Sequence, residues 1–243
     1  MKFGTEIQQN FTRKMIELDP WMTNFFGFPY AYVKGDVSEM DFQQNPGMLL
    51  EWRIPIGDLT TINRASQLGF EMMEVMVDFE TEIQPVSENL PFLRPYRQGD
   101  LETLLQINFE CFVSNPKFSN RFKSEKYFQQ DKANEYFEMG IRNFVEKESA
   151  IVVVGEDEMG IFGYYIMDGQ SPLYYKGIST SVLPRVRGKQ MHIHMQRKAS
   201  EMVGQPYTVL NRTQASNYAV LNNHIKEKRK LTAITSIFLK KLP

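Results

Sequence analysis

The sequence contains one cysteine, Cys111, among its 243 residues. A single cysteine excludes an intrachain disulfide and suits a reducing compartment, so we expect a cytoplasmic protein. Soft metal ligands are also scarce, because the chain has only three histidines. Two of them, His192 and His194, are two residues apart in an expected helix and therefore diverge. We expect no metal site, and we interpret Cys111 as a small buried residue.

Long apolar runs and an excess of one charge are lacking too. No stretch approaches the roughly 20 apolar residues that a membrane-spanning helix needs. The polar start of the chain, which includes Glu6, is not typical of a signal peptide. The formal net charge is −1, so no global field attracts nucleic acid or an anionic membrane, and we expect neither as a partner. A local basic patch could still bind a phosphorylated small molecule.

Hydrophobic residues make up 42% of the chain, enough for one large domain or two smaller ones. Apolar periodicity in the N-terminal part predicts helices over 6–18 and 62–68, an aromatic loop over 21–29, and strands over 30–33, 48–54 and 70–83. Gly69 ends the second helix. The proline-containing stretch 85–91 is the predicted boundary, so we expect an N-terminal α/β half-domain over 1–88 and a second domain over 89–243.

Helical and strand patterns alternate in the second part. They predict helices over 101–112, 131–145 and 190–203, strands over 151–154, 161–167 and 173–182, and an irregular aromatic segment over 118–128. Alternating strands and helices predict an α/β fold with a mixed central sheet and flanking helices.

The segment from Val182 to Lys189 joins a predicted strand to a predicted helix through a basic turn. Backbone N–H groups of such a turn and the positive end of the helix dipole point toward one spot. Arg185, Arg187 and Lys189 add three cations there. The pattern favours a phosphate or pyrophosphate site, and the alternative is a solvated basic loop.

The spacing Val-x-Pro-x-x-Arg-Gly-Lys over 182–189 resembles the coenzyme A-binding segment of the GNAT acyltransferases. In that family the strand presents backbone groups to the pantetheine, and the turn wraps the pyrophosphate. Arg94-Pro95, 150–154, 160–167 and 213–219 resemble other parts of the fold, so the resemblance covers residues 91–243. It implies acetyl-CoA as co-substrate and no metal. It also implies these cofactor-binding residues: Val182, Arg187, Gly188, Lys189, Gln190, Met191, His192 and Asn217.

The sequence departs from the family at several of these positions. Gln190 and His192 stand where the family usually has small residues. His224, seven residues after Asn217, stands where the family often has a Tyr that protonates the departing thiolate. The resemblance therefore implies His224 as the acid, and packing at the sheet edge is the alternative. Asn217 is either a simple N-cap or a cap that also contacts pantetheine.

Three segments outside the general GNAT region, 21–27, 68–78 and 119–122, resemble the dTDP-fucosamine acetyltransferases. That branch acetylates an amino group on a dTDP-linked deoxysugar, which implies a nucleotide-linked amino sugar as acceptor. The matching position for the proposed base is Glu74. Its apolar neighbours would partly desolvate an inward-facing carboxylate, and the alternative is that Glu74 points outward.

The same resemblance directs attention to Arg121, whose guanidinium could bind the diphosphate of the acceptor while Phe122, Tyr127 or Phe128 stacks on the base or sugar. The alternative is a surface arginine beside core aromatic residues. The branch also implies a homodimer. The helix–Leu-Gly-Phe–strand order before Glu74 resembles the closing half of a GNAT domain, so 1–88 is predicted to be a degenerate half-copy.

Two rival functions remain open from the sequence. One is acetyl transfer to another amine, such as an antibiotic or a peptide N-terminus. The other is a degenerate module that binds CoA weakly or only mediates assembly, which Gln190, His192 and His224 would explain.

Overall fold

The computed structural model describes residues 15–116 and 118–243. The chain separates into two compact units. Unit 1 comprises the described residues up to Met72 together with Ile237–Pro243, and unit 2 comprises Met73–Ser236. The division falls inside the strands β4 (Glu71–Ile83) and β10 (Lys230–Lys241), which therefore contribute to both units. A separate domain over 1–88 stays a prediction.

The described residues of unit 1 form three strands and three short helices that belong to this unit alone. These are β1 (Ile16–Leu18), α1 (Pro20–Phe26), β2 (Tyr30–Val33), α2 (Glu39–Gln43), β3 (Leu49–Pro55) and α3 (Leu59–Gln67). The strand order is β1-β2-β3-β10, in which β1 and β2 are antiparallel and β2 and β3 are parallel. Leu50, Trp52 and Ile54, the predicted apolar face of β3, lie in the core of this unit.

Two predictions for this unit are wrong. Residues 16–18 form a strand, because Ile16 pairs with Val33, whereas the rest of the helix predicted over 6–18 lies largely outside the described residues. The predicted aromatic loop contains helix α1. Asp19 caps that helix by accepting a hydrogen bond from the Met22 amide at 2.9 Å, and Gly27, at φ +77°, ends it.

Unit 2 contains the larger part of the sheet. Its elements are β5 (Leu93–Pro95), α4 (Leu101–Asn108), α5 (Gln130–Val145), β6 (Ala150–Asp157), β7 (Gly160–Ser171), β8 (Tyr174–Val182), α6 (Met191–Val203), β9 (Tyr207–Gln214) and α7 (Tyr218–Lys226). The strand order is β10-β4-β9-β8-β7-β6-β5. Strands β8 and β9 are parallel, whereas β4–β9, β5–β6, β6–β7 and β7–β8 are antiparallel pairs.

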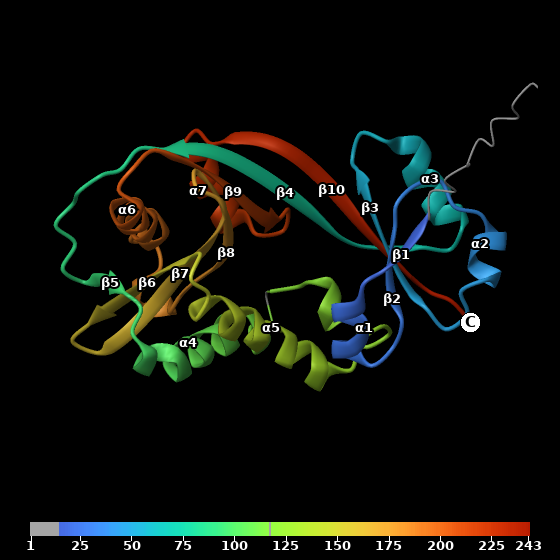
Figure 1. The fold of residues 1–243 in the computed structure, drawn as a ribbon, viewed down its shortest axis with the longest axis horizontal. Helices are drawn as coiled ribbons and strands as arrows, with labels where there is room; N and C mark the ends of the chain where they lie inside the picture. The colour runs from blue at the N-terminus through green and yellow to red at the C-terminus, as the bar shows by residue number, and fades with distance from the viewer. Residues whose placement is uncertain (1–14, 117) are drawn as a thin grey trace, which may run out of the picture. The chain divides into compact units, whose positions relative to one another are not determined.

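Helices cover both faces of the sheet of unit 2. Helices α4 and α5 lie on one face and α6 on the other (Figure 1). Alternate residues of β7 supply the two cores, so Tyr164 and Ile166 face α4 and α5, and Tyr165 and Met167 face α6. This arrangement confirms the predicted α/β fold with a mixed central sheet and flanking helices.

Helices α3 and α7 begin and end in the same way. Asp58 (φ −89°, ψ 72°) and Asn217 (φ −87°, ψ 67°) each cap the helix by accepting a hydrogen bond from the amide three residues later. Left-handed residues end both helices, Gly69 at φ +79° and Lys228 at φ +54°. A long strand follows each helix. The two helices thus share a local geometry, and the half-copy over 1–88 stays a prediction.

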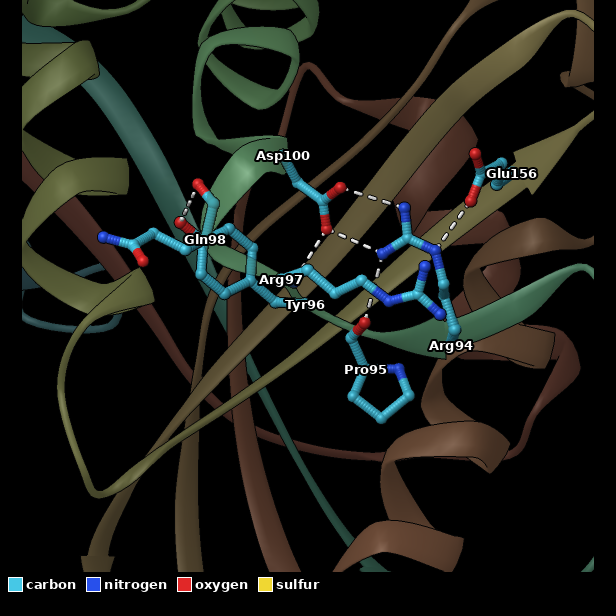
Figure 2. Close-up of polar contacts among 7 residues, drawn as sticks. All are labelled: Arg94, Pro95, Tyr96, Arg97, Gln98, Asp100 and Glu156. Atoms are coloured by element: carbon cyan, nitrogen blue, oxygen red, sulfur yellow. Dashed lines mark hydrogen bonds and ion pairs between the residues drawn. The ribbon is translucent and has the colours of Figure 1, made fainter.

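Arg94 joins β5 to the start of α4 and to β6 (Figure 2). Its guanidinium donates two hydrogen bonds to Asp100, at 2.7 and 2.9 Å, and one to Glu156, at 2.6 Å. The Asp100 carboxylate also accepts a hydrogen bond from the Arg97 amide at 2.7 Å. The Arg94 guanidinium, followed by the Arg97 amide, holds the pKa of Asp100 below its ordinary value of 3.8.

We expect Asp100→Asn to lower the free energy of unfolding by about 1.5–3 kcal/mol at pH 7, the range for hydrogen bonds to a charged group. Because the folded pKa is depressed, this stability is present above the ordinary value of 3.8 and is lost as the pH falls through the folded value. Urea unfolding from pH 7 to pH 2 measures the difference. The control is Glu156→Gln, whose half-exposed side chain is expected to contribute about 0–1 kcal/mol. A difference for Asp100→Asn that stays constant down to pH 2 would contradict the assignment.

Candidate functional site

The parallel strands β8 and β9 separate partway along their length. They pair only where Tyr174, Tyr175 and Lys176 face Thr208, Val209 and Leu210. In the part of the chain that the structure describes, no pairing between them follows, although β8 continues to Val182 and β9 to Gln214. Two diverging strand edges can bind an extended ligand through main-chain hydrogen bonds.

Asn211 lies where the strands separate. Its side chain lies over Gly177 so closely that a Cβ atom at Gly177 would overlap the amide oxygen. The Asn211 side chain is buried, and its Nδ2 has no hydrogen-bond partner among the described residues. A buried amide donor without a partner is costly, so a ligand or water between the strands would satisfy it. The sequence analysis missed Asn211, whose only signal is a polar residue in an apolar strand.

The basic turn at the end of β8 leads directly into α6. Gly188 adopts φ +78°, a conformation that suits glycine, and Gln190 adopts φ +56°. The Ile193 and His194 amides donate to the Gln190 carbonyl at 2.9 and 3.2 Å. The amides before them belong to the group that a helix start leaves without an intrahelical acceptor, and this group binds anions.

The three cations of this segment have different surroundings. Arg185 forms an ion pair with Asp157 and donates to the Gly160 carbonyl at 3.2 Å, so it ties the turn to the β6–β7 hairpin. Arg187 is exposed, and its Nε donates to the Val182 carbonyl at 3.2 Å. Lys189 is exposed as well. Arg187 and Lys189 therefore supply the positive charge that faces solvent at the turn.

His192 on α6 and His224 on α7 are neighbours, with ring centroids 5.8 Å apart. Burial, followed by the nearby Arg229 charge, lowers the pKa of each to about 3, so both rings are neutral near pH 7. His224 is 1% exposed and packs against Phe79. A buried neutral imidazole is a poor proton donor, so these surroundings favour the packing interpretation of His224.

Glu74 and Arg121, predicted separately as base and as anion-binding residue, form an ion pair. The other carboxylate oxygen of Glu74 accepts a hydrogen bond from Gln214 Nε2 at 2.7 Å. The Glu74 side chain is 6% exposed and that of Arg121 is 13% exposed. Neither the outward-facing Glu74 nor the surface Arg121 considered from the sequence is therefore observed. The sequence analysis missed Gln214, the last residue of β9.

The aromatic residues predicted to stack on the acceptor are buried. Phe122 and Tyr127 are 4% and 5% exposed. The ring of Phe122 packs on Tyr136, with centroids 4.2 Å apart, and the guanidinium of Arg121 lies 4.4 Å from its centroid. Phe122 is therefore a core aromatic residue beside Arg121, as the alternative interpretation expects of the aromatic residues, whereas Arg121 itself is not at the surface.

The topology brings the two groups of residues to one edge of the sheet. Parallel neighbouring strands end at the same edge, so the turn after Val182 and the end of β9 at Gln214 lie on the same side. Gln214 holds the Glu74 carboxylate there. Asn217 begins α7 three residues later and accepts a hydrogen bond from the Val220 amide at 3.4 Å, as a helix cap does. A basic turn, two open strand edges and a buried carboxylate thus lie at one edge of the sheet of unit 2.

In residues 15–116 and 118–243, no helix is long and apolar enough to cross a membrane. The same residues contain no group of three or more His, Cys, Asp or Glu that could hold a metal ion.

No protein-family profile matches the sequence. No curated protein matches it either. Solved structures are similar in fold. A conserved protein of unknown function from Staphylococcus epidermidis has a TM-score of 0.63 and 12% identity, over 88% of this chain and 85% of its own.

Two further structures with this fold are described as acetyltransferases. A GCN5-related N-acetyltransferase from Sphaerobacter thermophilus has a TM-score of 0.54 and 12% identity, over 82% of this chain and 61% of its own. A protein from Novosphingobium aromaticivorans described as an acetyltransferase of the GNAT family has a TM-score of 0.53 and 10% identity, over 96% of this chain and 91% of its own. The chain therefore has the fold of the GNAT N-acetyltransferases.

Proposed function

We propose that this protein is an N-acetyltransferase that moves the acetyl group of acetyl-CoA to an amine. The observation that carries the proposal is the separation of β8 and β9 between the Arg187 turn and the Glu74–Gln214 pair. A cofactor with an anionic end, an extended amide-containing arm and a reactive thioester matches these three features in order.

Acetyl-CoA would bind with its pyrophosphate at the turn and its pantetheine arm between the strands. Arg187 and Lys189 supply charge, and the amides of Gly188, Gln190, Met191 and His192 supply donors at the start of α6. The backbone of Val182 and the Nδ2 of Asn211 lie along the path of the arm. Asn217 keeps its role as the cap of α7 and stands beside the thiol end.

The reaction would proceed by direct attack. The amine nitrogen attacks the thioester carbonyl carbon, the carbonyl oxygen becomes an oxyanion, and the C–S bond then breaks to release CoA as a thiolate. Glu74 takes the proton that the attacking nitrogen loses. His224, which the family resemblance implies as proton donor, is buried and neutral. We therefore give it a packing role.

The acceptor that we propose is the amino group of a nucleotide-linked amino-deoxysugar, such as a dTDP-linked 3- or 4-amino-dideoxyhexose. We also propose that the protein acts as a homodimer. The sequence resemblance supports both proposals. Arg121 would share its guanidinium between Glu74 and the diphosphate. Phe122 and Tyr127 would then act by holding Arg121 and its loop, because their rings are buried.

Release of free thiol from acetyl-CoA tests the function. The panel contains dTDP-amino sugars, the corresponding free amino sugars, an aminoglycoside and a peptide with a free N-terminus. Turnover with the dTDP-amino sugars alone supports the full proposal, and turnover with another amine supports acetyl transfer but contradicts the acceptor. No turnover and no thermal shift with acetyl-CoA would favour the assembly module.

We expect Arg187→Ala to weaken CoA binding by about 1–3 kcal/mol, because it removes a charge-assisted hydrogen bond to phosphate. Isothermal titration calorimetry measures the change. Arg185→Ala is the matched control, since Arg185 lies two residues away but is engaged by Asp157. Equal CoA affinities for the wild-type protein and Arg187→Ala would contradict the assignment of the pyrophosphate to this turn.

A further inference from the structure

Unit 1 contains a cavity of about 770 Å³, whereas the proposed acetyl-transfer residues all belong to unit 2. Its walls come from the ends of β2 and β3 and from the start of α3. The volume falls within the range of about 300–1,000 Å³ that is usual for small-molecule sites. In open α/β sheets, ligands bind beyond the carboxyl ends of parallel strands, and β2 and β3 are a parallel pair.

Arg53 is anchored in the wall of this cavity by contacts with Glu51 and Tyr32. Its Nε donates a hydrogen bond to Glu51 at 2.5 Å, and its guanidinium carbon lies 4.9 Å from the centroid of the Tyr32 ring. Glu51 is fully buried and also accepts a hydrogen bond from the Tyr30 hydroxyl. The Arg53 side chain is 41% exposed, and among the described residues no acceptor is recorded for its two terminal amino groups. A guanidinium anchored through Nε presents these two groups as a fork that matches an oxyanion.

The acidic residues of the wall are already engaged. Asp36 forms an ion pair with Arg64 at 2.5 Å. Asp58 caps α3 by accepting a hydrogen bond from the Thr61 amide at 3.0 Å. Lys34 is a second cation in the wall, with its Nζ 5.4 Å from the Tyr32 centroid. Lys34 forms an ion pair with Glu17 at 3.2 Å, and Arg64 is engaged by Asp36. Among the described residues of the wall, the Arg53 fork is therefore the cationic group that is open to a ligand.

The same arrangement of elements occurs in both units. Each has a parallel strand pair, β2–β3 or β8–β9, whose second strand leads through a capping Asp58 or Asn217 into a helix. Within unit 1 the cavity lies at the carboxyl ends of β2 and β3. Within unit 2 the proposed acetyl-transfer site lies at the carboxyl ends of β8 and β9, the corresponding parallel pair. The repeated arrangement of a parallel strand pair and a capped helix indicates a ligand-binding position in unit 1, although unit 1 has no counterpart of the Arg187 turn among its described residues.

We propose that unit 1 binds a second small molecule through a carboxylate or phosphate group held by the Arg53 fork, with a flat or apolar body against Tyr32. We propose binding without catalysis at this site, because the Glu51 carboxylate already accepts hydrogen bonds from Arg53 and Tyr30. Arg53 is the residue that selects an anion.

Tryptophan fluorescence locates such a ligand. The chain has two tryptophans, and Trp52 lines the cavity whereas Trp21 does not, so Trp21→Phe leaves a single reporter. The full-length variant is titrated with phenyl phosphate and with benzoate, and benzyl alcohol serves as an uncharged probe of similar shape. We expect a saturable change with an anion and none with benzyl alcohol. Either anion supports the proposal, and the tighter one identifies phosphate or carboxylate as the preferred group.

Substitution of Arg53 completes the test. Arg53→Met is expected to weaken binding of the anion by about tenfold to a hundredfold, since it removes charge-assisted hydrogen bonds. Arg53→Met alone leaves Glu51 buried without its counter-charge and could unfold the protein. The double variant Glu51→Gln with Arg53→Met removes both charges, so it tests binding in a folded protein. Unchanged affinity in the double variant overturns the proposal. So does a response that Arg187→Ala abolishes and Arg53→Met does not, because the anion would then bind at the turn of unit 2.

Discussion

Glu74→Gln is expected to lower kcat for acetyl transfer by about 10²–10⁴, the usual contribution of a positioned general base. The substitution keeps the length of the side chain and its acceptor oxygen, but it removes the ability to take a proton from the attacking amine. The buried carboxylate is held by Arg121 and Gln214 on β9, so its position does not depend on the bound acceptor. Steady-state kinetics with saturating acetyl-CoA measures the effect.

The pH–rate profile separates the base from the acceptor. An amine acceptor produces an acidic limb because its ammonium form cannot attack, and that limb persists in Glu74→Gln. The matched control is Glu82→Gln, which makes the same change at an exposed position of the same strand and should leave kcat unchanged. Full activity together with an unchanged limb in Glu74→Gln would contradict the role. Circular dichroism must accompany the assay, so that an unfolded variant is recognised.

Arg121→Ala is expected to lower the free energy of unfolding by about 3–5 kcal/mol, because it leaves the buried Glu74 carboxylate without its counter-charge. The Glu74 side chain is 6% exposed, so solvent screens its charge only weakly. Removal of the supporting contact with Phe122 adds to the loss. For a chain of this size the melting temperature should fall by roughly 6–20 °C in differential scanning calorimetry.

The double variant Glu74→Gln with Arg121→Met distinguishes the ion pair from general disruption. Since it removes both charges, it should recover much of the stability that Arg121→Ala loses. Where Arg121→Ala remains folded, the proposed acceptor site predicts a larger rise in KM for the dTDP-amino sugar than for acetyl-CoA. A change in stability below about 0.5 kcal/mol, typical of surface substitutions, would contradict the buried pair.

The sequence by itself was sufficient for the elements whose signals are local. Alternating apolar residues identified β2 and β3, and Gly69 identified the end of α3, because periodicity and a left-handed residue act within a few positions. The link between strand β8, the Arg187 turn and helix α6 was predictable for the same reason. The α1 helix was missed although its cap, Asp19, and Pro20 are local signals, because the aromatic residues were interpreted as a loop.

Only the tertiary structure decided which side chains meet. Glu74 is separated along the sequence from Arg121 by 47 residues and from Gln214 by 140. The hydrophobic periodicity of a segment does not indicate which distant residues become its neighbours in the sheet. The separation of β8 from β9, the buried position of His224, and the cavity around Arg53 likewise arise where strands far apart in the chain become neighbours or diverge. Charge and residue type are present in the sequence. Their burial and their partners depend on long-range packing, which local preference does not determine.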